Sequence, residues 1–136
     1  MKYYKTVFFC LFAFVLNAQS QANMDTSSPD SRLYEVYETS YVDQIQSSNP
    51  FLIQRWNYYL DHAYTVLEEK DAKLTDYPTI NITDLEHINI LLLEKEQGLT
   101  HDFDNPTVYR ISNTNKLLVY KSGKQFNELF KKSLKQ

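Results

Sequence analysis

Glycine is almost absent from this chain, since Gly98 and Gly123 are the only two among 136 residues. Phosphate-binding loops and tight hairpin turns depend on backbone conformations that glycine adopts at little cost. The scarcity therefore argues against a nucleotide site built on a glycine-rich loop. It also argues against a turn-rich β-sandwich or propeller, and the sequence contains no internal repeat and no low-complexity tract.

The N-terminus has the layout of a secretory signal peptide. Lys2 and Lys5 give a short basic start, residues 7–16 form an unbroken apolar run, and small and polar residues follow. Ten apolar residues are too few to cross a bilayer as a helix, which takes about 20. The ending Asn17-Ala18-Gln19 resembles signal peptides of the Bacteroidota. We therefore expect an exported protein, periplasmic or extracellular, with no transmembrane segment after cleavage.

We expect cleavage after Ser20, because Ala18 and Ser20 are the small residues that the peptidase requires; cleavage after Ala18 or Ala22 is an alternative. Cys10 lies inside the apolar run, unlike a lipoprotein cysteine, so the mature chain contains no thiol. The predicted organisation is a signal peptide over 1–20, a flexible leader over 21–28 and a single small α+β domain over 29–136.

Charge is distributed unevenly along the expected mature chain, which carries 12 basic and 17 acidic residues, a net of −5. Residues 21–104 hold 16 acidic and five basic residues, a net of −11, whereas residues 116–136 hold six basic and one acidic, a net of +5. The simplest interpretation is that the basic end docks on the acidic body. The alternative is a basic surface that contacts anionic lipid or an acidic partner, formed by Lys124, Lys131, Lys132 and Lys135. Nucleic-acid binding is not expected.

Two amphipathic helices are predicted in the first half of the domain. Ser28-Pro29 and Asn49-Pro50 each place a capping residue before a proline at the first helical position. The first helix is predicted to reach about Gln46 and the second about Lys70, with Trp56 in the core against the first helix. The short link between them predicts an antiparallel helical hairpin.

A β-hairpin and a C-terminal helix are predicted in the second half. Residues 107–111 and 116–121 flank the polar loop 112–115, and a helix is expected after Ser122-Gly123. A short strand is expected over 79–82.

Residues 83–97 allow two interpretations. Thr83 with Glu86 forms a capping-box pattern and Gly98 could stop a helix, whereas Ile88-Asn89-Ile90 alternates as a strand does. We predict a turn over 83–87 and a strand over 88–96. The expected fold is thus α+β: an N-terminal helical hairpin packed on a small antiparallel sheet, with a C-terminal helix.

Candidate chemical groups are few, and neither catalytic residues nor cofactors are predicted. Each of the three histidines adjoins an acid, but sequence neighbours do not face each other on a helix or strand. His101, Asp102 and Asp104 form a polar loop that is a weak candidate for metal binding. The loop lacks the glycine and the glutamate of a common calcium loop, so a solvated connection is the simpler interpretation.

A line of side chains on the second helix is a candidate contact surface. Phe51, Arg55, Tyr58 and His62 follow the spacing i, i+4, i+7 and i+11, almost opposite Trp56. Tyr, Phe and Arg are frequent anchors of protein interfaces, so the line predicts a partner-binding stripe. Two alternatives are stacking of Arg55 on the aromatic rings and burial of the line under the sheet.

These observations favour an exported, non-enzymatic binding or accessory protein of the bacterial cell envelope, such as a small subunit of a larger assembly with a protein partner. One alternative is a small secreted hydrolase that uses carboxylates or a histidine. The other is a secreted inhibitor or immunity-type protein, which the acidic body would suit.

Overall fold

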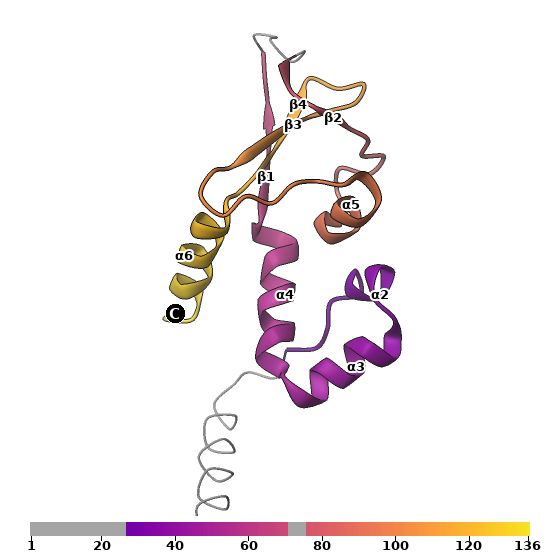
Figure 1. Cartoon of the computed structure of the whole chain (residues 1–136), viewed down its shortest axis with the longest axis vertical. Coiled ribbons are helices and arrows are strands. Elements are labelled where there is room, and N and C mark those ends of the chain that lie inside the picture. The colour runs from indigo at the N-terminus through magenta and orange to yellow at the C-terminus, as the bar shows by residue number, and fades with distance from the viewer. Residues whose placement is uncertain (1–26, 71–75) are drawn as a thin grey trace, which may run out of the picture.

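The computed structural model describes residues 27–70 and 76–136, so the expected signal peptide and residues 21–26 of the expected leader lie outside the described residues. The chain folds as an α+β protein, which confirms the predicted fold class (Figure 1). None of the helices within the described ranges combines the length and the apolar character needed to cross a membrane. The elements in chain order are α2 (Leu33–Val36), α3 (Thr39–Ser48), α4 (Pro50–His62), β1 (Tyr64–Glu68), β2 (Thr79–Ile80), α5 (Ile90–Gln97), β3 (Thr107–Ile111), β4 (Lys116–Tyr120) and α6 (Gly123–Ser133).

The four strands form one sheet in the order β1-β4-β3-β2. The β1–β4 and β3–β4 pairs are antiparallel, but β2 pairs with β3 in parallel, with Thr79 opposite Arg110 and Ile80 opposite Ile111. The prediction of a purely antiparallel sheet is therefore wrong at this pair. The segment with α5 connects β2 to β3, and a crossover of this length is what a parallel pair requires.

The first helix differs from its prediction. The predicted start at Ser28-Pro29 is wrong, because this segment is tied to α4 instead: the backbone N–H of Asp30 donates to the Asn57 Oδ1 at 2.9 Å, and the Asn57 amide donates to the Ser28 carbonyl at 2.7 Å. The helical stretch then divides into α2 and α3. The division falls at Tyr37, whose backbone is extended and whose ring stacks on Trp56 at 5.2 Å.

The second helix begins as predicted and ends early. The Asn49 side chain caps α4 by accepting from the backbone N–H of Leu52, with Pro50 at the first helical position. The predicted end near Lys70 is wrong, because the helix ends at His62 and the chain continues as β1 (Figure 1). Residues 64–67 include tyrosine, threonine and valine, which favour strands, and β1 pairs along its whole length with β4. Trp56 contacts Tyr37 and Tyr41 of the N-terminal segment, as predicted, but it is only partly buried and packs against the core from outside.

The strand predicted over 88–96 is also wrong, because residues 90–97 form helix α5. Its N-cap is Asn89 rather than Thr83, and its C-cap is Gly98 with a φ of 66°. The predicted hairpin of β3 and β4 is confirmed, as is the C-terminal helix α6, which opens with a capping box between Ser122 and Gln125. The short strand expected over 79–82 is confirmed over 79–80.

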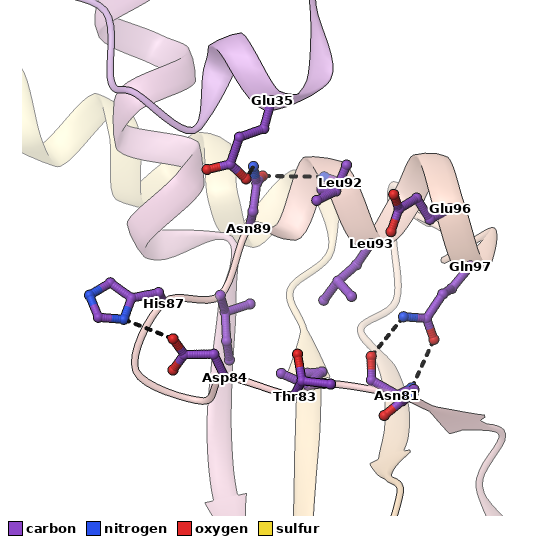
Figure 2. A pocket seen from close by; sticks show the side chains of 12 residues that line it. Glu35, Asn81, Thr83, Asp84, His87, Asn89, Leu92, Leu93, Glu96 and Gln97 are labelled. Atoms are coloured by element: carbon purple, nitrogen blue, oxygen red, sulfur yellow. Dashed lines mark hydrogen bonds and ion pairs between the residues drawn. The ribbon is translucent and has the colours of Figure 1, made fainter.

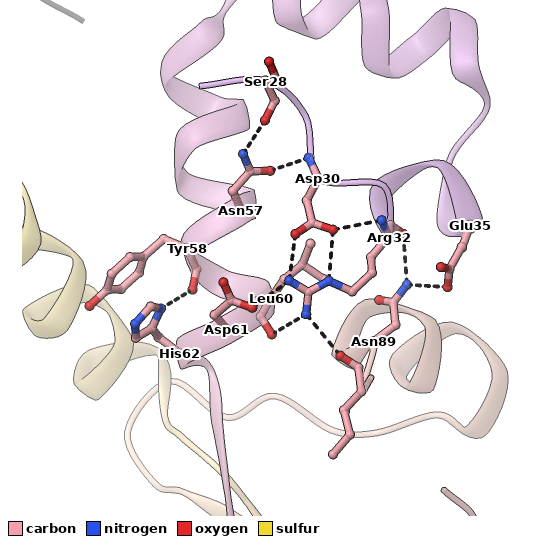
Figure 3. Close-up of polar contacts among 11 residues, drawn as sticks. Ser28, Asp30, Arg32, Glu35, Asn57, Tyr58, Leu60, Asp61, His62 and Asn89 are labelled. Carbon is pink, nitrogen blue, oxygen red and sulfur yellow. Dashed lines mark hydrogen bonds and ion pairs between the residues drawn. The ribbon is translucent and has the colours of Figure 1, made fainter. Parts of the chain in front are cut away.

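An arginine fixes the N-terminal segment to the rest of the molecule (Figure 3). The Arg32 guanidinium donates to Asp30 Oδ2 at 2.7 Å, to Asp61 Oδ1 at 2.6 Å and to the Ile88 carbonyl at 3.3 Å. The hydrogen bond from Arg32 holds the pKa of the Asp30 carboxyl below its ordinary value. These bonds join three separate stretches of chain beside the core, whose fully buried members include Leu33, Val42, Ile53, Leu60, Ile90, Ile111 and Leu118.

Candidate functional site

A cavity of about 280 Å³ lies between α4, α6 and the loop that follows α5. We call it the aromatic cavity, because the described residues that line it include one tryptophan, one tyrosine and two phenylalanines: Trp56, Tyr59, Phe103 and Phe126. Its other lining residues are Arg55, Leu91, His101, Gly123 and Asn127. The lining residues of α4 and of α6 lie three or four positions apart, so each of these helices presents one face to the cavity, and Leu91 is contributed by α5.

The loop over residues 101–105 closes one side of the aromatic cavity and is fastened to the start of α6. The backbone N–H of Gly123 donates to the Asp102 carbonyl at 3.0 Å, and that of Lys124 donates to the Phe103 carbonyl at 2.9 Å. Gly123 permits this approach, because a Cβ atom there would lie 2.8 Å from the Phe103 ring. The close approach of the Phe103 ring therefore explains why a glycine stands at position 123.

A cluster of polar side chains is centred on the Tyr59 hydroxyl. This hydroxyl donates to Glu94 Oε1 at 2.9 Å, forms a hydrogen bond with the Tyr120 hydroxyl and lies 3.4 Å from Nδ1 of His101. Burial raises the pKa of Tyr59 and of Glu94, and burial lowers the pKa of His101. All three shifts favour the neutral forms, so the cluster is suited to hydrogen bonding more than to carrying charge.

Arg55 brings a permanent positive charge to the aromatic cavity. Its Nη2 donates to Asn127 Oδ1 at 2.6 Å, and its Cζ lies 5.1 Å from the Phe126 ring centroid and 5.2 Å from that of Phe130. No carboxylate within residues 27–70 and 76–136 forms a salt bridge with it. The guanidinium is thus positioned by α6 without a counter-ion from the described chain.

The predicted partner-binding stripe on α4 faces α6. The Phe51 ring lies 5.6 Å from Phe130, and the Tyr58 ring lies 5.9 Å from Phe126 and 5.4 Å from Phe130. The fourth residue, His62, stacks on Tyr58 at 3.9 Å. The aromatic residues of the stripe therefore have an intramolecular role, and partner binding through them stays a prediction. Arg55 stacks on rings of α6 and is the one member of the stripe that lines the aromatic cavity.

The candidate metal ligands of the 101–105 loop do not converge. Asp102 Oδ1 accepts from the backbone N–H groups of Asp104 and Asn105, whereas the Asp104 carboxylate pairs with Lys124 Nζ at 3.1 Å. His101 Nδ1 faces the Tyr59 hydroxyl. In the described part of the chain, no three His, Cys, Asp or Glu side chains are grouped so that they could hold a metal ion.

A second cavity, of about 290 Å³, lies between the 81–89 segment and α5 (Figure 2). Its polar side chains mainly bond to one another or to the backbone. Gln97 exchanges two hydrogen bonds with the backbone of Asn81, at 2.8 and 2.7 Å, and His87 Nδ1 lies 3.1 Å from Asp84 Oδ2. Asn89 caps α5 and donates to Glu35 Oε2 at 3.0 Å. These contacts hold the 81–89 segment against its neighbours, so we assign this cavity a structural role.

The predicted basic surface borders an open groove of about 460 Å³ on α6. Lys124 and Lys132 line it together with Lys121 and Leu129, whereas Lys131 and Lys135 do not. Lys121 donates to the Tyr64 carbonyl and to Thr65 Oγ1, both at 3.0 Å, and burial lowers its pKa. Lys131 pairs with Glu128 at 3.6 Å on the same helix. Contact of these lysines with anionic lipid stays a prediction.

Comparisons with protein-family models, with curated proteins and with solved structures give no match to this chain. The geometry of the aromatic cavity is therefore the basis on which a function is argued. Sequence reasoning placed Trp56 against the first helix and described the 101–105 loop as polar, but it did not bring Tyr59, His101 and Phe103 together. Their meeting depends on tertiary structure, since 42 residues separate Tyr59 from His101.

Proposed function

We propose that this chain is an exported, non-enzymatic binding protein of the bacterial cell envelope, and that its aromatic cavity receives one bulky side chain of a protein partner. The observation that carries the proposal is the cavity walled by Trp56, Tyr59, Phe103 and Phe126. Its volume of about 280 Å³ is just below the range of about 300–1,000 Å³ typical of small-molecule sites. One aromatic anchor is of suitable size, and such anchors in pockets dominate the energetics of many protein interfaces.

The polar groups around the aromatic cavity support recognition over catalysis. A histidine base commonly has its second nitrogen oriented by a carboxylate. Here the contact of the His101 imidazole is a phenol hydroxyl, and Glu94 bonds to that same hydroxyl. Fixed donors and acceptors of this kind orient a bound group.

Trp56 provides a direct test, because it is the only tryptophan of the chain and it lines the aromatic cavity. The secreted form, labelled with ¹⁵N, is titrated with N-acetyl-phenylalaninamide while the single indole N–H signal is followed. We expect a saturable shift that Phe103→Ala weakens several-fold. Tyr77→Ala, which truncates another exposed aromatic ring outside this lining, is the matched control and should bind like wild type. A Trp56 signal that does not respond to the probe would contradict the proposal.

One observation favours a hydrolase as the second candidate function. Burial lowers the pKa of His101, which leaves its imidazole neutral and able to accept a proton over a wider pH range. A hydrolase would turn over N-acetyl-phenylalanine methyl ester, and His101→Gln would abolish the turnover. The binding proposal predicts instead that wild type and His101→Gln both leave the ester intact.

A further inference from the structure

Among the described residues that line the aromatic cavity, Arg55 is the only Asp, Glu, Lys or Arg. The side chain is half-buried, and a partly desolvated cation is more favourable when a counter-ion accompanies it. Asn127 Oδ1 is the one acceptor that residues 27–70 and 76–136 provide for this guanidinium, which carries five N–H donors. The cation therefore retains donors for a bound group.

The surroundings of Arg55 hold the guanidinium in place and leave its charge uncompensated. The rings of Phe126 and Phe130 lie 5.1 and 5.2 Å from its Cζ atom, within the range of cation–π contacts. Both rings belong to α6, within the basic end of the chain, where residues 116–136 carry a net charge of +5. An anionic group is the natural complement to this part of the cavity.

The acidic residues near the aromatic cavity are already engaged. Glu94 accepts the Tyr59 hydroxyl and burial raises its pKa, which disfavours its charged form. Asp102 accepts two backbone N–H groups, and Asp104 pairs with Lys124. None of these three carboxyl groups lines the cavity or bonds to Arg55.

We infer that the aromatic cavity binds the C-terminal aromatic residue of a partner protein, with its ring among Trp56, Phe103 and Phe126 and its α-carboxylate on Arg55. The inference rests on the proposed function and names the chemistry of the partner. A guanidinium binds a carboxylate through two parallel N–H···O bonds, which adds orientation to affinity. The α-carboxylate of the partner would therefore bind the Arg55 guanidinium, next to the site that holds the ring.

The size of the cavity favours a chain end over an internal acidic residue. A volume of about 280 Å³ accommodates one residue, so the ring and the carboxylate belong to the same residue. In an extended segment, neighbouring side chains point to opposite sides, so an acid adjacent to the aromatic anchor would point away from Arg55. The α-carboxylate of a terminal residue has no such restriction.

Three matched probes test the inference on the secreted form, with the Trp56 indole signal as the readout. N-acetyl-phenylalanine carries the α-carboxylate, N-acetyl-phenylalaninamide is neutral, and N-acetyl-aspartyl-phenylalaninamide carries an internal carboxylate. We expect the first to bind roughly tenfold more tightly than the second, as a charge-assisted hydrogen-bonded pair implies. The third should bind like the second.

The outcomes separate the inference from the proposed function. Equal affinity for N-acetyl-phenylalanine and N-acetyl-phenylalaninamide would contradict the role of Arg55 but would still agree with binding of the ring in the aromatic cavity. An aspartyl probe as tight as the acid would overturn the assignment to a chain end. Failure of all three probes to move the Trp56 signal would overturn the ring site itself.

Two variants link the affinity to the guanidinium. Arg55→Met keeps an unbranched, largely apolar side chain but removes the guanidinium, so the acid and the neutral amide should bind about equally. Lys131→Met removes a cation of α6 that does not line the cavity and should keep the preference. A preference for the acid that survived in a folded Arg55→Met protein would contradict the inference.

Discussion

The absence of a Cβ atom at Gly123, the first residue of α6, allows the side chains around the aromatic cavity to take their positions. A Cβ atom at this position would lie 2.8 Å from Cδ2 of Phe103 and 3.3 Å from Nε2 of His101, and both of these residues line the cavity. We predict that Gly123→Ala displaces them and weakens binding of N-acetyl-phenylalanine by roughly tenfold. The free energy of unfolding should fall by about 1–3 kcal/mol, since the backbone Cα of Phe103 also lies 3.3 Å from this Cβ and the fastened loop must move. Titration and urea denaturation measure the two effects separately.

The other glycine of the chain is the matched control. Gly98 has a φ of 66° and no atom within 4 Å of a Cβ built on it, so its replacement strains the backbone without a clash. We expect Gly98→Ala to lower the free energy of unfolding by about 1 kcal/mol and to keep the affinity for the probe. An equal loss of affinity in both variants would indicate a global effect and contradict the role given to Gly123.

His101 gives the stability a pH dependence with a definite sign. Burial lowers its pKa in the folded state below the ordinary value of 6.5, and the nearby Asp102 charge only partly opposes this. The unfolded chain therefore binds a proton first as the pH falls, so stability is lost below about pH 6.5. We predict that His101→Gln loses less stability than wild type between about pH 7 and about pH 5, measured by urea denaturation. Identical losses in the two proteins would contradict this assignment.

At the scale of the elements, a side-chain cap stabilises the start of α5. Asn89 is buried; its Oδ1 accepts from the Leu92 N–H at 3.2 Å, and its Nδ2 donates to the Arg32 carbonyl at 2.9 Å. Asn89→Ala removes the cap and leaves a partly buried carbonyl without this donor. We predict a loss of about 2–3 kcal/mol in the free energy of unfolding.

The cap of α4 provides the comparison for this prediction. The Asn49 side chain accepts a capping hydrogen bond from the Leu52 N–H at 3.3 Å, but it is exposed and forms no second hydrogen bond with residues 27–70 and 76–136. Asn49→Ala should therefore cost about 1 kcal/mol or less in the same denaturation experiment. A loss at Asn89 no larger than the loss at Asn49 would show that the link to Arg32 contributes nothing.

The sequence predicted correctly those features that depend on neighbouring residues alone, such as helix caps and polar turns. The cap at Asn49-Pro50, the polar loop between β3 and β4 and the start of α6 are all correct. The end of α4 was missed because apolar residues at 63, 64, 66 and 67 continue the helical spacing, while pairing with β4, which lies far along the chain, decides the strand. The α5 helix was missed because alternation over Ile88-Asn89-Ile90 covers a cap and not a strand.

At the scale of the whole molecule, aromatic packing joins the basic end to the rest more than charge does. One ion pair, between Lys124 and Asp104, links α6 to the acidic body within the described residues. By contrast, Phe126 and Phe130 contact Phe51, Arg55 and Tyr58 of α4. The charge pattern alone predicted electrostatic docking, but ring contacts that depend on tertiary structure form the interface. The aromatic cavity results from this packing. The sequence shows which aromatic residues the chain contains, but it does not show that they meet around one cavity.

Export is the property of the whole chain that the proposed function requires. Residues 1–20 are expected to be removed, so the protein recovered from the periplasm or the medium should begin at Gln21 and lack Cys10. We predict this N-terminus by intact mass measurement of the full chain expressed with a C-terminal tag in a Gram-negative host. Phe12→Arg interrupts the apolar run and should keep the uncleaved chain inside the cell. An uncleaved wild-type chain in the cytoplasm would contradict the signal peptide and the proposed place of the protein in the cell envelope. A lipid-modified Cys10 in the membrane fraction would contradict the predicted cleavage after Ser20.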